Sequence, residues 1–500
     1  MASTDNVKPH SSWVKTGPNT YTQPYGFQEV LYNAISVPPG SPGLFLIGSS
    51  VTFSYRPSAT GSELSSHELA ALLRNAWLQL RQKYPTLAAE NLPQGKVYTS
   101  PSSPAELEEW LATTFIVTPG KTWVELWKNM IKTRQMTLYF CPEVRQLFLQ
   151  GEHHILDGRG MMNLWDRFFR ALASPARIQD LMRADGSEVS RLPPRSDDLL
   201  DMQEKKPGRG QQRALELLAP MATMKAPITI PVSRPLPRWS PENLALELKA
   251  DTRTAESIAA ACKAQRLSVT AAWHAAVALA TQAIQAKRNS SAAAAAAGGK
   301  NTGPTAGTQY PCLGNFDLRR YFPAPEPSPT DSDDVDAYAL GNHHCVLPYV
   351  LAPDGKTFAQ MARELAAFYQ QDIPKADPEA WSALAPMIRM MVPDFTRAQL
   401  EETTPALSSL GVVDKFIASS YADAAGKGGG WRVEDVWFGD TVTGPWLEHF
   451  MWSWQGQLCL NTCYNPAYYT RAEVDEFNQL VLRKMLDGLG VVGSGPGSKL

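Results

Sequence analysis

The chain has no long hydrophobic run, and this absence limits where it can reside. Its longest apolar stretch, Val269 to Ile284, contains Trp273 and His274 and falls short of the roughly 20 residues that a membrane span needs. The polar N-terminus also lacks the apolar region of a secretory signal peptide. The sequence therefore predicts no membrane span, and the apolar stretch suits a helix in a protein core.

An excess of charge of either sign is also missing. The 47 basic and 49 acidic residues give a formal net charge of −2, and no basic stripe is visible along the chain. Nucleic acid is therefore not an expected partner. The 500 residues, 44% of them hydrophobic, can bury a large core and predict roughly two to three domains.

Cysteine is scarce: six residues are scattered over the chain, which predicts an intracellular protein with reduced thiols. Cys459 and Cys463 lie four apart in a strand-like run, where they would share one face without forming a metal site. His343-His344-Cys345 has no second cluster at ligand spacing. No metal site is predicted.

What stands out is the stretch from Gly151 to Gly160, GEHHILDGRG, in which His153, Asp157 and Gly158 form an H-x-x-x-D-G pattern. Histidine is the side chain best suited to move a proton near neutral pH. The pattern lies between a strand-like run and an apolar, helix-like run at 161–172. We therefore predict that His153 is a catalytic base, although a short motif also fits a structural histidine.

Composition divides the chain into four parts. An N-terminal lobe at 1–187 carries the motif, and a crossover linker at 188–239 is rich in Pro, Arg, Lys and Asp. A C-terminal lobe is predicted at 240–492, followed by a flexible tail at 493–500.

Helix and strand signals alternate along both lobes, which indicates mixed α and β structure. The low-complexity segments Ser290 to Gly307 and Pro323 to Asp336 predict solvent loops. The predicted strands are 44–55, 136–141, 144–150 and 244–248, and the predicted helices are 65–84, 104–114, one starting at Thr252 or Thr254, and one from Ser268 to about 286.

Several segments together resemble the acyltransferase superfamily that is built on the H-x-x-x-D-G motif. This superfamily includes the plant BAHD acyltransferases, the fungal trichothecene O-acetyltransferases and the condensation domains of peptide synthetases. Besides the motif, the matching segments are Leu267–His274 in a second-lobe helix, Asn315–Arg319, Ala339–Asn342 and Gly456–Tyr469.

Two departures from the family patterns refine the resemblance. Condensation domains carry His-His before the three spacers, whereas Glu152 fills the first of those positions here and His154 lies inside the spacer. The expected base is therefore His153. Plant members carry Asp-Phe-Gly-Trp-Gly, and the nearest match, Asp435-Val-Trp-Phe-Gly439, is degenerate, which points toward a fungal-type member.

The resemblance implies an α/β (α+β) fold of two chloramphenicol-acetyltransferase-like lobes. Each lobe would be a mixed sheet flanked by helices, with a channel between the lobes. It also implies acyl-CoA as cosubstrate, no bound cofactor or metal, and a monomer, because both halves of the channel would lie on one chain.

The resemblance assigns roles residue by residue. His153 would take the proton of an acceptor hydroxyl, and Asp157 would pair with Arg319, with Arg320 as second candidate, to hold the motif loop. Gly158 would leave the channel open beside the base. The substrate-channel candidates are His154, Asp435, Trp437 and Gly439.

The expected function is acyl-CoA-dependent O-acylation. An acetyl or a short or medium acyl group would move to a hydroxyl of a specialised metabolite, such as a terpenoid alcohol or a glycolipid. One alternative is a free-standing condensation-type enzyme that forms an amide or ester from a carrier-bound acyl group. Another is a non-catalytic binding protein with the same fold.

The last three residues, Ser498-Lys499-Leu500, match a peroxisomal address. They follow the stretch Gly493 to Gly497, which would leave them accessible. We therefore expect a peroxisomal import receptor as a partner and a peroxisomal location, with the cytoplasm as the alternative.

Overall fold

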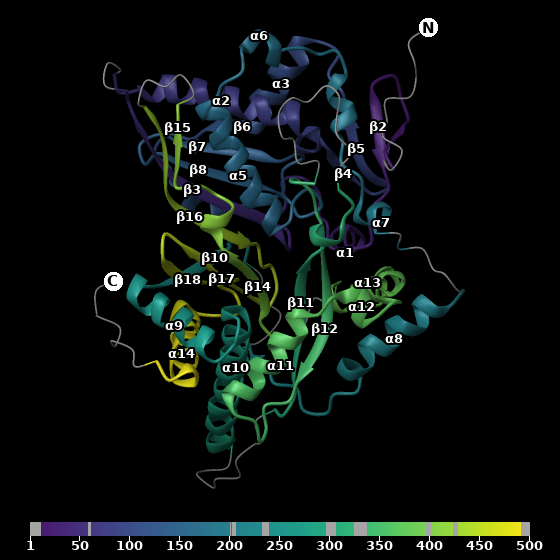
Figure 1. The fold of residues 1–500 in the computed structure, drawn as a ribbon, viewed down its shortest axis with the longest axis vertical. Helices are drawn as coiled ribbons and strands as arrows, with labels where there is room; N and C mark the ends of the chain where they lie inside the picture. Colours follow the sequence, from purple (N-terminus) through teal and green to yellow (C-terminus); the bar gives the residue numbers. More distant parts are fainter. Residues whose placement is uncertain are drawn as a thin grey trace. The chain divides into compact units, whose positions relative to one another are not determined.

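The computed structural model describes residues 12–58, 62–200, 202, 207–232, 240–296, 307–324, 338–396, 402–423 and 429–491. The chain divides into two compact units (Figure 1). Unit 1 comprises Met1–Gln203, Asp317–His344 and Val413–Thr441, and unit 2 comprises Glu204–Phe316, Cys345–Val412 and Val442–Leu500.

This division differs from the uninterrupted lobes that composition suggests, because strands late in the chain join the sheet of unit 1. Figure 1 shows β15 and β16, in yellow-green, beside β3, in purple. The sheet has the order β15-β16-β3-β8-β7-β6. Its strands are Ser420–Ala422, Gly430–Asp440, Leu46–Arg56, Gln146–Glu152, Thr137–Cys141 and Phe115–Val117, in that order.

The central strands of this sheet are buried on both faces. Ser49 of β3 faces helix α5 (Gly158–Ala173), where its hydroxyl accepts a hydrogen bond from Trp165 at 2.8 Å. The neighbouring Gly48 faces the opposite side, where an added Cβ would lie 2.8 Å from the ring of Trp127. Glycine is therefore required at position 48 by the close approach of the Trp127 ring.

Helix α5 is amphipathic, and its apolar stripe is buried in unit 1. Met161, Leu164, Trp165 and Phe168 are at most 2% exposed. Burial of each such side chain contributes about 1.5–3 kcal/mol, so this stripe fixes the helix on the sheet. The other helices of unit 1 are α1 Glu29–Ala34, α2 Ser66–Lys83, α3 Pro104–Thr114, α4 Trp123–Lys128, α6 Ile178–Leu181 and α7 Ser196–Leu199.

A smaller antiparallel sheet completes unit 1, with the order β1-β2-β5-β4. Short 3-10 turns lie at Pro85–Ala88, Ser187–Arg191, Arg319–Tyr321 and Val413–Lys415. The four strands are β1 Val14–Lys15, β2 Thr20–Gln23, β5 Gly95–Thr99 and β4 Glu90–Leu92.

Unit 2 is built on a second mixed sheet, of order β10-β18-β17-β14. Strands β14 and β17 run parallel, and the other pairs are antiparallel. Two further pairs are β11 with β12 and β9 with β13. The strands are β10 Leu244–Ala250, β18 Gln457–Tyr464, β17 Leu447–Trp454, β14 Ala406–Val412, β11 Tyr310–Asp317, β12 His344–Leu351, β9 Ile230–Pro231 and β13 Glu402–Thr403.

An alanine-rich helix, α10 (Val269–Ala296), forms the core of unit 2. Its residues Trp273 and Val277 are fully buried, and α11 and α14 pack beside it. Small alanine side chains let neighbouring elements approach closely while keeping a high helix propensity. The remaining helices are α8 Arg209–Ala222, α9 Thr252–Ala264, α11 Phe358–Gln370, α12 Ile373–Ala376, α13 Ala380–Thr396 and α14 Arg471–Leu489.

Most local predictions are confirmed, and two are wrong. Ser65 caps α2 in a reciprocal box with Glu68, and α3 has the predicted bounds. The segment from Ser290 to Ala296 is helical rather than a loop, because alanine is the best helix former. The stretch 188–239 is not merely a linker, since its described residues include α7 and α8.

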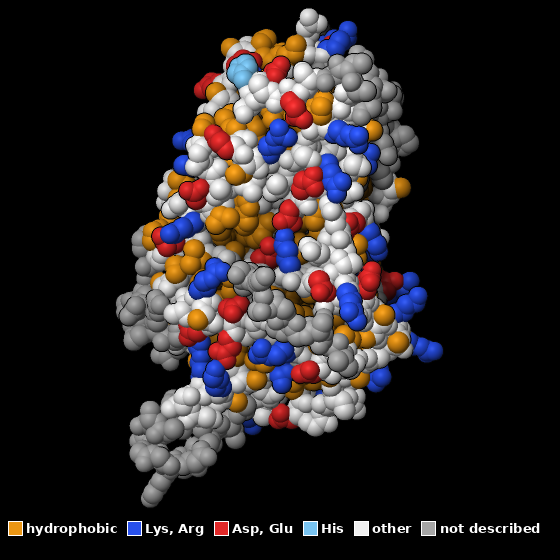
Figure 2. Space-filling model, turned by 90° about the vertical axis from the view of Figure 1, so that its left-hand side faces the viewer, with side chains coloured by type: hydrophobic (Ala, Val, Ile, Leu, Met, Phe, Trp, Pro, Cys, Tyr) orange, Lys and Arg blue, Asp and Glu red, His pale blue; other side chains and the backbone are white. Residues whose placement is uncertain are grey.

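Within the described residues no single helix is long and apolar enough to cross a membrane, although α9 and α10 pass that test as a pair bent by 102°. On the face drawn in Figure 2, basic and acidic side chains are interspersed. The predicted tail with Ser498, Lys499 and Leu500 lies outside the described residues.

Candidate active site

The H-x-x-x-D-G motif connects strand β8 to helix α5 within unit 1. Strand β8 ends at Glu152, a turn contains His153 and His154, and Asp157 is the N-cap of α5. The Asp157 carboxylate accepts a hydrogen bond from Gly160 N at 2.7 Å. Aspartate is favoured at this position because it satisfies a free N–H of the first helical turn. Gly158 is the first residue of the helix.

The Asp157 carboxylate is fully engaged in the interior of unit 1. Arg319 donates two parallel hydrogen bonds to it, from Nη1 to Oδ2 at 2.9 Å and from Nη2 to Oδ1 at 3.1 Å. The backbone N–H of His343 donates a further bond to Oδ2 at 2.8 Å. Burial alone would raise the pKa of Asp157, but the charge and hydrogen bonds of Arg319 outweigh it and hold that pKa well below its usual range.

Arg319 fastens the motif to a distant part of the chain. Its Nη2 also donates to the carbonyl oxygen of Gly341 at 3.0 Å, and the same carbonyl accepts from Asp157 N at 3.2 Å. An added Cβ at Gly341 would lie 2.2 Å from His343 Nε2, so only glycine fits there. An added Cβ at Gly160 would lie 3.1 Å from Gly341 O. The two glycines thus permit the close approach of the two segments.

His153 is half-buried, and its two ring nitrogens differ. Nδ1 is buried and has no hydrogen-bond partner among the described residues. Nε2 also makes no hydrogen bond with the described residues, but unlike Nδ1 it is not a buried atom. Burial, reinforced by His344, lowers the pKa of His153 to about 3. The imidazole is therefore neutral near pH 7, which is the form that can accept a proton.

Two histidines that the sequence reading did not assign to the site lie beside the motif. His344 is 5.2 Å from His153 between ring centroids, and its Nε2 is hydrogen-bonded to the Tyr32 hydroxyl at 3.2 Å. His343 is hydrogen-bonded through Nδ1 to Ser196 at 3.1 Å. Asn342 donates to the carbonyl oxygen of His153 at 3.0 Å. The tripeptide 342–344 therefore supports the motif turn rather than a metal.

Glu152 and His154 lie in a charged interior behind the base. Lys132 pairs with Glu152 at 2.8 Å, and Ser36 and Asn91 also donate to the Glu152 carboxylate. His154 is 2% exposed, and burial, then Lys96 and Lys132, lower its pKa well below 6.5. It is therefore neutral, and its 3.8 Å approach to Glu152 is not an ion pair. His154, a predicted channel residue, lies buried in this structure.

The other channel candidates lie on β16. Gly439 is paired with Gly48, and Trp437 is 3% exposed and packs against Trp123 and Trp127 with ring centroids at 4.5 and 4.7 Å. Asp435 is half-buried at an irregularity of the strand. The segment was expected in the second lobe, but it is part of the unit 1 sheet, and Trp437 packs in the core of that unit.

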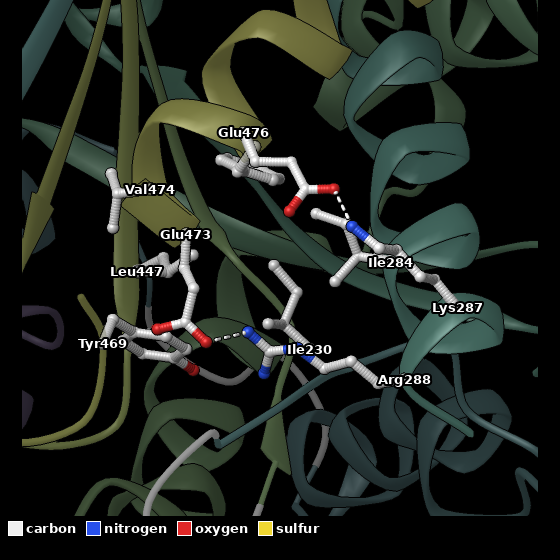
Figure 3. Close-up of a pocket in the computed structure, with 10 residues that line it drawn as sticks. Ile230, Ile284, Lys287, Arg288, Leu447, Tyr469, Glu473, Val474 and Glu476 are labelled. Carbon is white, nitrogen blue, oxygen red and sulfur yellow. Dashed lines mark hydrogen bonds and ion pairs between the residues drawn. The ribbon is translucent and has the colours of Figure 1, made fainter. Parts of the chain in front are cut away.

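A small hollow lies beside the motif, and a larger cavity lies in unit 2. A hollow of about 10 Å³ borders His153, His154 and Tyr32 in unit 1, which is room for roughly one water molecule. A cavity of about 200 Å³ lies in unit 2 (Figure 3), where Lys287 pairs with Glu476 and Arg288 with Glu473. The lining residues of the larger cavity include no histidine, and its carboxylates Glu473 and Glu476 are paired with Arg288 and Lys287.

The cysteines are poorly suited to covalent catalysis. All six are buried, and burial raises the pKa of Cys262 to about 11. A buried thiol of raised pKa is a poor nucleophile. No group of three or more metal-binding side chains occurs in the part of the chain that the structure describes.

The fold is shared with solved acyltransferases and condensation domains. TRI3 trichothecene 15-O-acetyltransferase from Fusarium sporotrichioides aligns with a TM-score of 0.76 at 16% identity, covering 96% of this chain and 99% of that one. The first condensation domain of the CDA synthetase aligns with a TM-score of 0.55 at 15% identity, covering 94% and 97%. The chain therefore has the α/β fold of two chloramphenicol-acetyltransferase-like lobes that was predicted from its motifs.

Sequence relatives agree with this class. O-acetyltransferase pigM of Monascus ruber is 26% identical over 465 residues, covering 92% of this chain and 83% of that protein. Acetyltransferase pigO of Monascus ruber is 24% identical over 488 residues, covering 96% and 98%. No protein-family model matches the chain. The fold and these fungal acetyltransferase homologues together support an acyltransferase.

A third relative is described as a transcription factor and not as an enzyme. The loline biosynthesis cluster 1 transcription factor lolU1 of Epichloe uncinata is 26% identical over 454 residues, covering 84% of this chain and 86% of that protein. The formal charge of −2 gives this chain no overall attraction to nucleic acid. The relatives pigM and pigO, together with the H-x-x-x-D-G geometry, therefore favour an acyltransferase.

Proposed function

We propose that the protein is an acyl-CoA-dependent O-acyltransferase of fungal secondary metabolism. The single observation that carries the proposal is His153, which is neutral and half-buried and whose Nε2 makes no hydrogen bond with the described residues. The turn that holds it is fastened by the buried Asp157–Arg319 pair. The acetyltransferases pigM and pigO, which align along most of the chain, support the same conclusion.

In the proposed reaction His153 Nε2 takes the proton of an acceptor hydroxyl while that oxygen attacks the thioester carbonyl. The tetrahedral intermediate then collapses, and the departing CoA sulfur receives the proton from the His153 imidazolium. General-base assistance of this kind contributes roughly 10²–10⁴ in rate. Asp157 does not relay the proton, because Arg319 and the His343 N–H already engage its two oxygens.

Transfer would be direct, without an acyl-enzyme. The cysteines are buried, and the motif turn contains no serine or threonine that could act as a nucleophile beside His153. The acceptor would be a small molecule with a hydroxyl group, such as a terpenoid alcohol or a glycolipid. The donor would carry an acetyl or a short or medium acyl chain.

Release of CoA tests the proposed function. The purified full chain is incubated with acetyl-, hexanoyl- or decanoyl-CoA and a pooled extract of fungal alcohols and glycolipids, with no carrier protein. Free thiol is measured, and new esters are identified by mass spectrometry. Acceptor-dependent thiol release supports the proposal. No release with any donor would overturn it in favour of a carrier-bound donor or a non-catalytic protein.

For location, we propose import into peroxisomes through Ser498, Lys499 and Leu500. The test is a fluorescent protein fused to the N-terminus of the full chain, with and without these three residues. Punctate signal that becomes diffuse without them supports the proposal, and an identical distribution of the two would contradict it. That the protein acts as a monomer also stays a prediction, which its sedimentation in solution would check.

A further inference from the structure

An aromatic ring covers the face of the His153 imidazole. Tyr32 of α1 stacks on it with ring centroids 4.3 Å apart and planes inclined by 7°. Tyr32 is 7% exposed, and its hydroxyl is held by His344 Nε2 at 3.2 Å. Two contacts therefore hold the Tyr32 side chain in place. Its ring packs on His153, and its hydroxyl is hydrogen-bonded to His344.

A base at this position creates an electrostatic problem during turnover. When His153 takes the acceptor proton, a positive charge develops in a partly desolvated place, where it is costly unless compensated. The nearest motif carboxylate, Asp157, is neutralised by Arg319, and Glu152 is paired with Lys132. Among the described residues, no carboxylate accepts a hydrogen bond from the His153 ring.

The face of an aromatic ring attracts a cation whose centre lies within about 6 Å of the ring centroid. Tyr32 meets this condition for an imidazolium on His153. We propose that Tyr32 is a positioning residue for acyl transfer, whose ring holds the His153 imidazole and stabilises the positive charge that forms on it. This inference rests on the proposed role of His153 as the base.

His344 completes the arrangement. Its hydrogen bond to the Tyr32 hydroxyl keeps the phenol ring parallel to His153. A proton on His344 would oppose the charge on His153 at 5.2 Å, and burial lowers the pKa of His344 to about 4, so that it is neutral near pH 7. The hydroxyl therefore orients the ring, and the ring face acts on the charge.

The chain provides a matched control a few residues earlier. Tyr25 packs on His154 with ring centroids 4.9 Å apart and planes inclined by 39°. His154 is buried with both ring nitrogens unpaired among the described residues, and the proposed reaction places no proton on it. Replacing Tyr25 removes a ring from a neighbouring histidine without touching the base.

The test compares Tyr32→Leu, Tyr32→Phe and a series in which fluorinated phenylalanines with one, two and three ring fluorines replace Tyr32. We expect Tyr32→Leu to lower kcat about 2- to 30-fold, with KM changed less than about 2-fold, because the ring acts on a charge that exists only in the transition state. Tyr32→Phe should retain most of kcat. Added fluorines should lower kcat stepwise at constant melting temperature, because they weaken the ring face without changing its shape much.

The same series at position 25 should give no trend. A wild-type kcat in Tyr32→Leu, or a flat fluorine series at position 32, would overturn the proposal. A uniform loss in which the melting temperature falls with each substitution would also overturn it, because that result indicates only structural packing.

A second readout keeps the inference separate from the proposed function. Diethyl pyrocarbonate acylates a neutral imidazole nitrogen, and its attack also places positive charge on the ring. The rate at which His153 is modified at pH 7, followed by peptide mass spectrometry, should fall along the same fluorine series. A falling rate in a protein that turns over no acyl-CoA would support Tyr32 and refute the acyltransferase, whereas a flat rate would refute Tyr32.

Discussion

Histidines of strongly lowered pKa occur in both units, but their surroundings differ. In unit 1, His153 lies near the ion pairs Asp157–Arg319 and Glu152–Lys132, and its Nε2, which is not buried, makes no hydrogen bond within the described part of the chain. In unit 2, His449 is fully buried, stacks on Trp273 and is hydrogen-bonded through Nδ1 to Thr462 at 2.7 Å, while its buried Nε2 has no partner among the described residues. Burial lowers the pKa of both histidines to about 3.

A lowered pKa does not by itself identify a catalytic histidine. His449 begins a hydrogen-bond chain that runs through Thr462 to Asn478 and ties strands β17, β18 and β10 to helix α14. His153 instead lies on a turn held by the Asp157–Arg319 pair, and its Nε2 is not buried. The accessible nitrogen on a rigid support, rather than the pKa, distinguishes the candidate base.

Replacing each of the two histidines should have opposite effects on turnover and stability. His153→Ala should lower kcat by roughly 10²–10⁴, because a hydroxyl is a poor nucleophile without a base. His449→Gln should lower the free energy of unfolding by about 1–3 kcal/mol and leave kcat nearly unchanged. Steady-state CoA release and urea unfolding of both variants check this. A His449→Gln variant that loses turnover while it remains folded would contradict the assignment.

The support of the motif can be removed at Arg319. Arg319→Met leaves the buried Asp157 carboxylate uncompensated and should lower the free energy of unfolding by about 3–5 kcal/mol. Adding Asp157→Asn to this variant should restore part of the loss. Urea unfolding of the two variants and of the wild type gives the comparison. Equal stability of Arg319→Met and wild type would show that the pair does not hold the motif.

The pH dependence of stability tests whether burial keeps His449 of unit 2 neutral. His449 has a pKa of about 3 in the folded state and 6.5 when unfolded, so the unfolded chain takes up a proton first as the pH falls. The stability associated with a neutral His449 is complete above pH 6.5 and declines below it, by at most about 1.4 kcal/mol per pH unit. The stability gap between wild type and His449→Gln should therefore narrow from pH 6 to pH 5. A constant gap would mean that His449 is not held neutral by burial.

The smallest effect is expected at the exposed ion pair of the unit 2 cavity. The side chains of Lys287 and Glu476 are 66% and 44% exposed, so water screens their attraction. Lys287→Met should change the free energy of unfolding by less than about 1 kcal/mol and leave CoA release unaltered. A large loss of turnover in this variant would give the cavity in Figure 3 a role that the account does not assign.

Local features of this fold are readable from the sequence, and long-range ones are not. The capping box at Ser65 and the strand before the motif follow from nearby residues. Strand β16 pairs with β3 across nearly the whole chain, and no local pattern reveals that pairing. The degenerate segment 435–439 was therefore expected in the wrong lobe, and the burial of Trp437 between Trp123 and Trp127 could not be anticipated.

The sequence likewise predicts only part of the candidate site. The motif names His153 and Asp157, and resemblance supplies Arg319 as the partner that the structure brings to Asp157. Tyr32 lies in a Pro- and Gly-rich lead with no motif, and His344 begins a strand, so neither carries a signal in one sequence. Only folding brings these rings onto the base. Their contribution depends on geometry rather than on spacing along the chain.

The most direct test of the central claim, that His153 acts as a base in direct transfer, is a single turnover with acetyl-CoA followed by rapid quenching. Direct transfer predicts no CoA burst without acceptor and no change in the intact-protein mass. With acceptor, CoA and ester should appear together, and His153→Ala should lose both. A burst of CoA with an acetylated protein in the absence of acceptor would contradict the account, because it would establish a covalent acyl-enzyme.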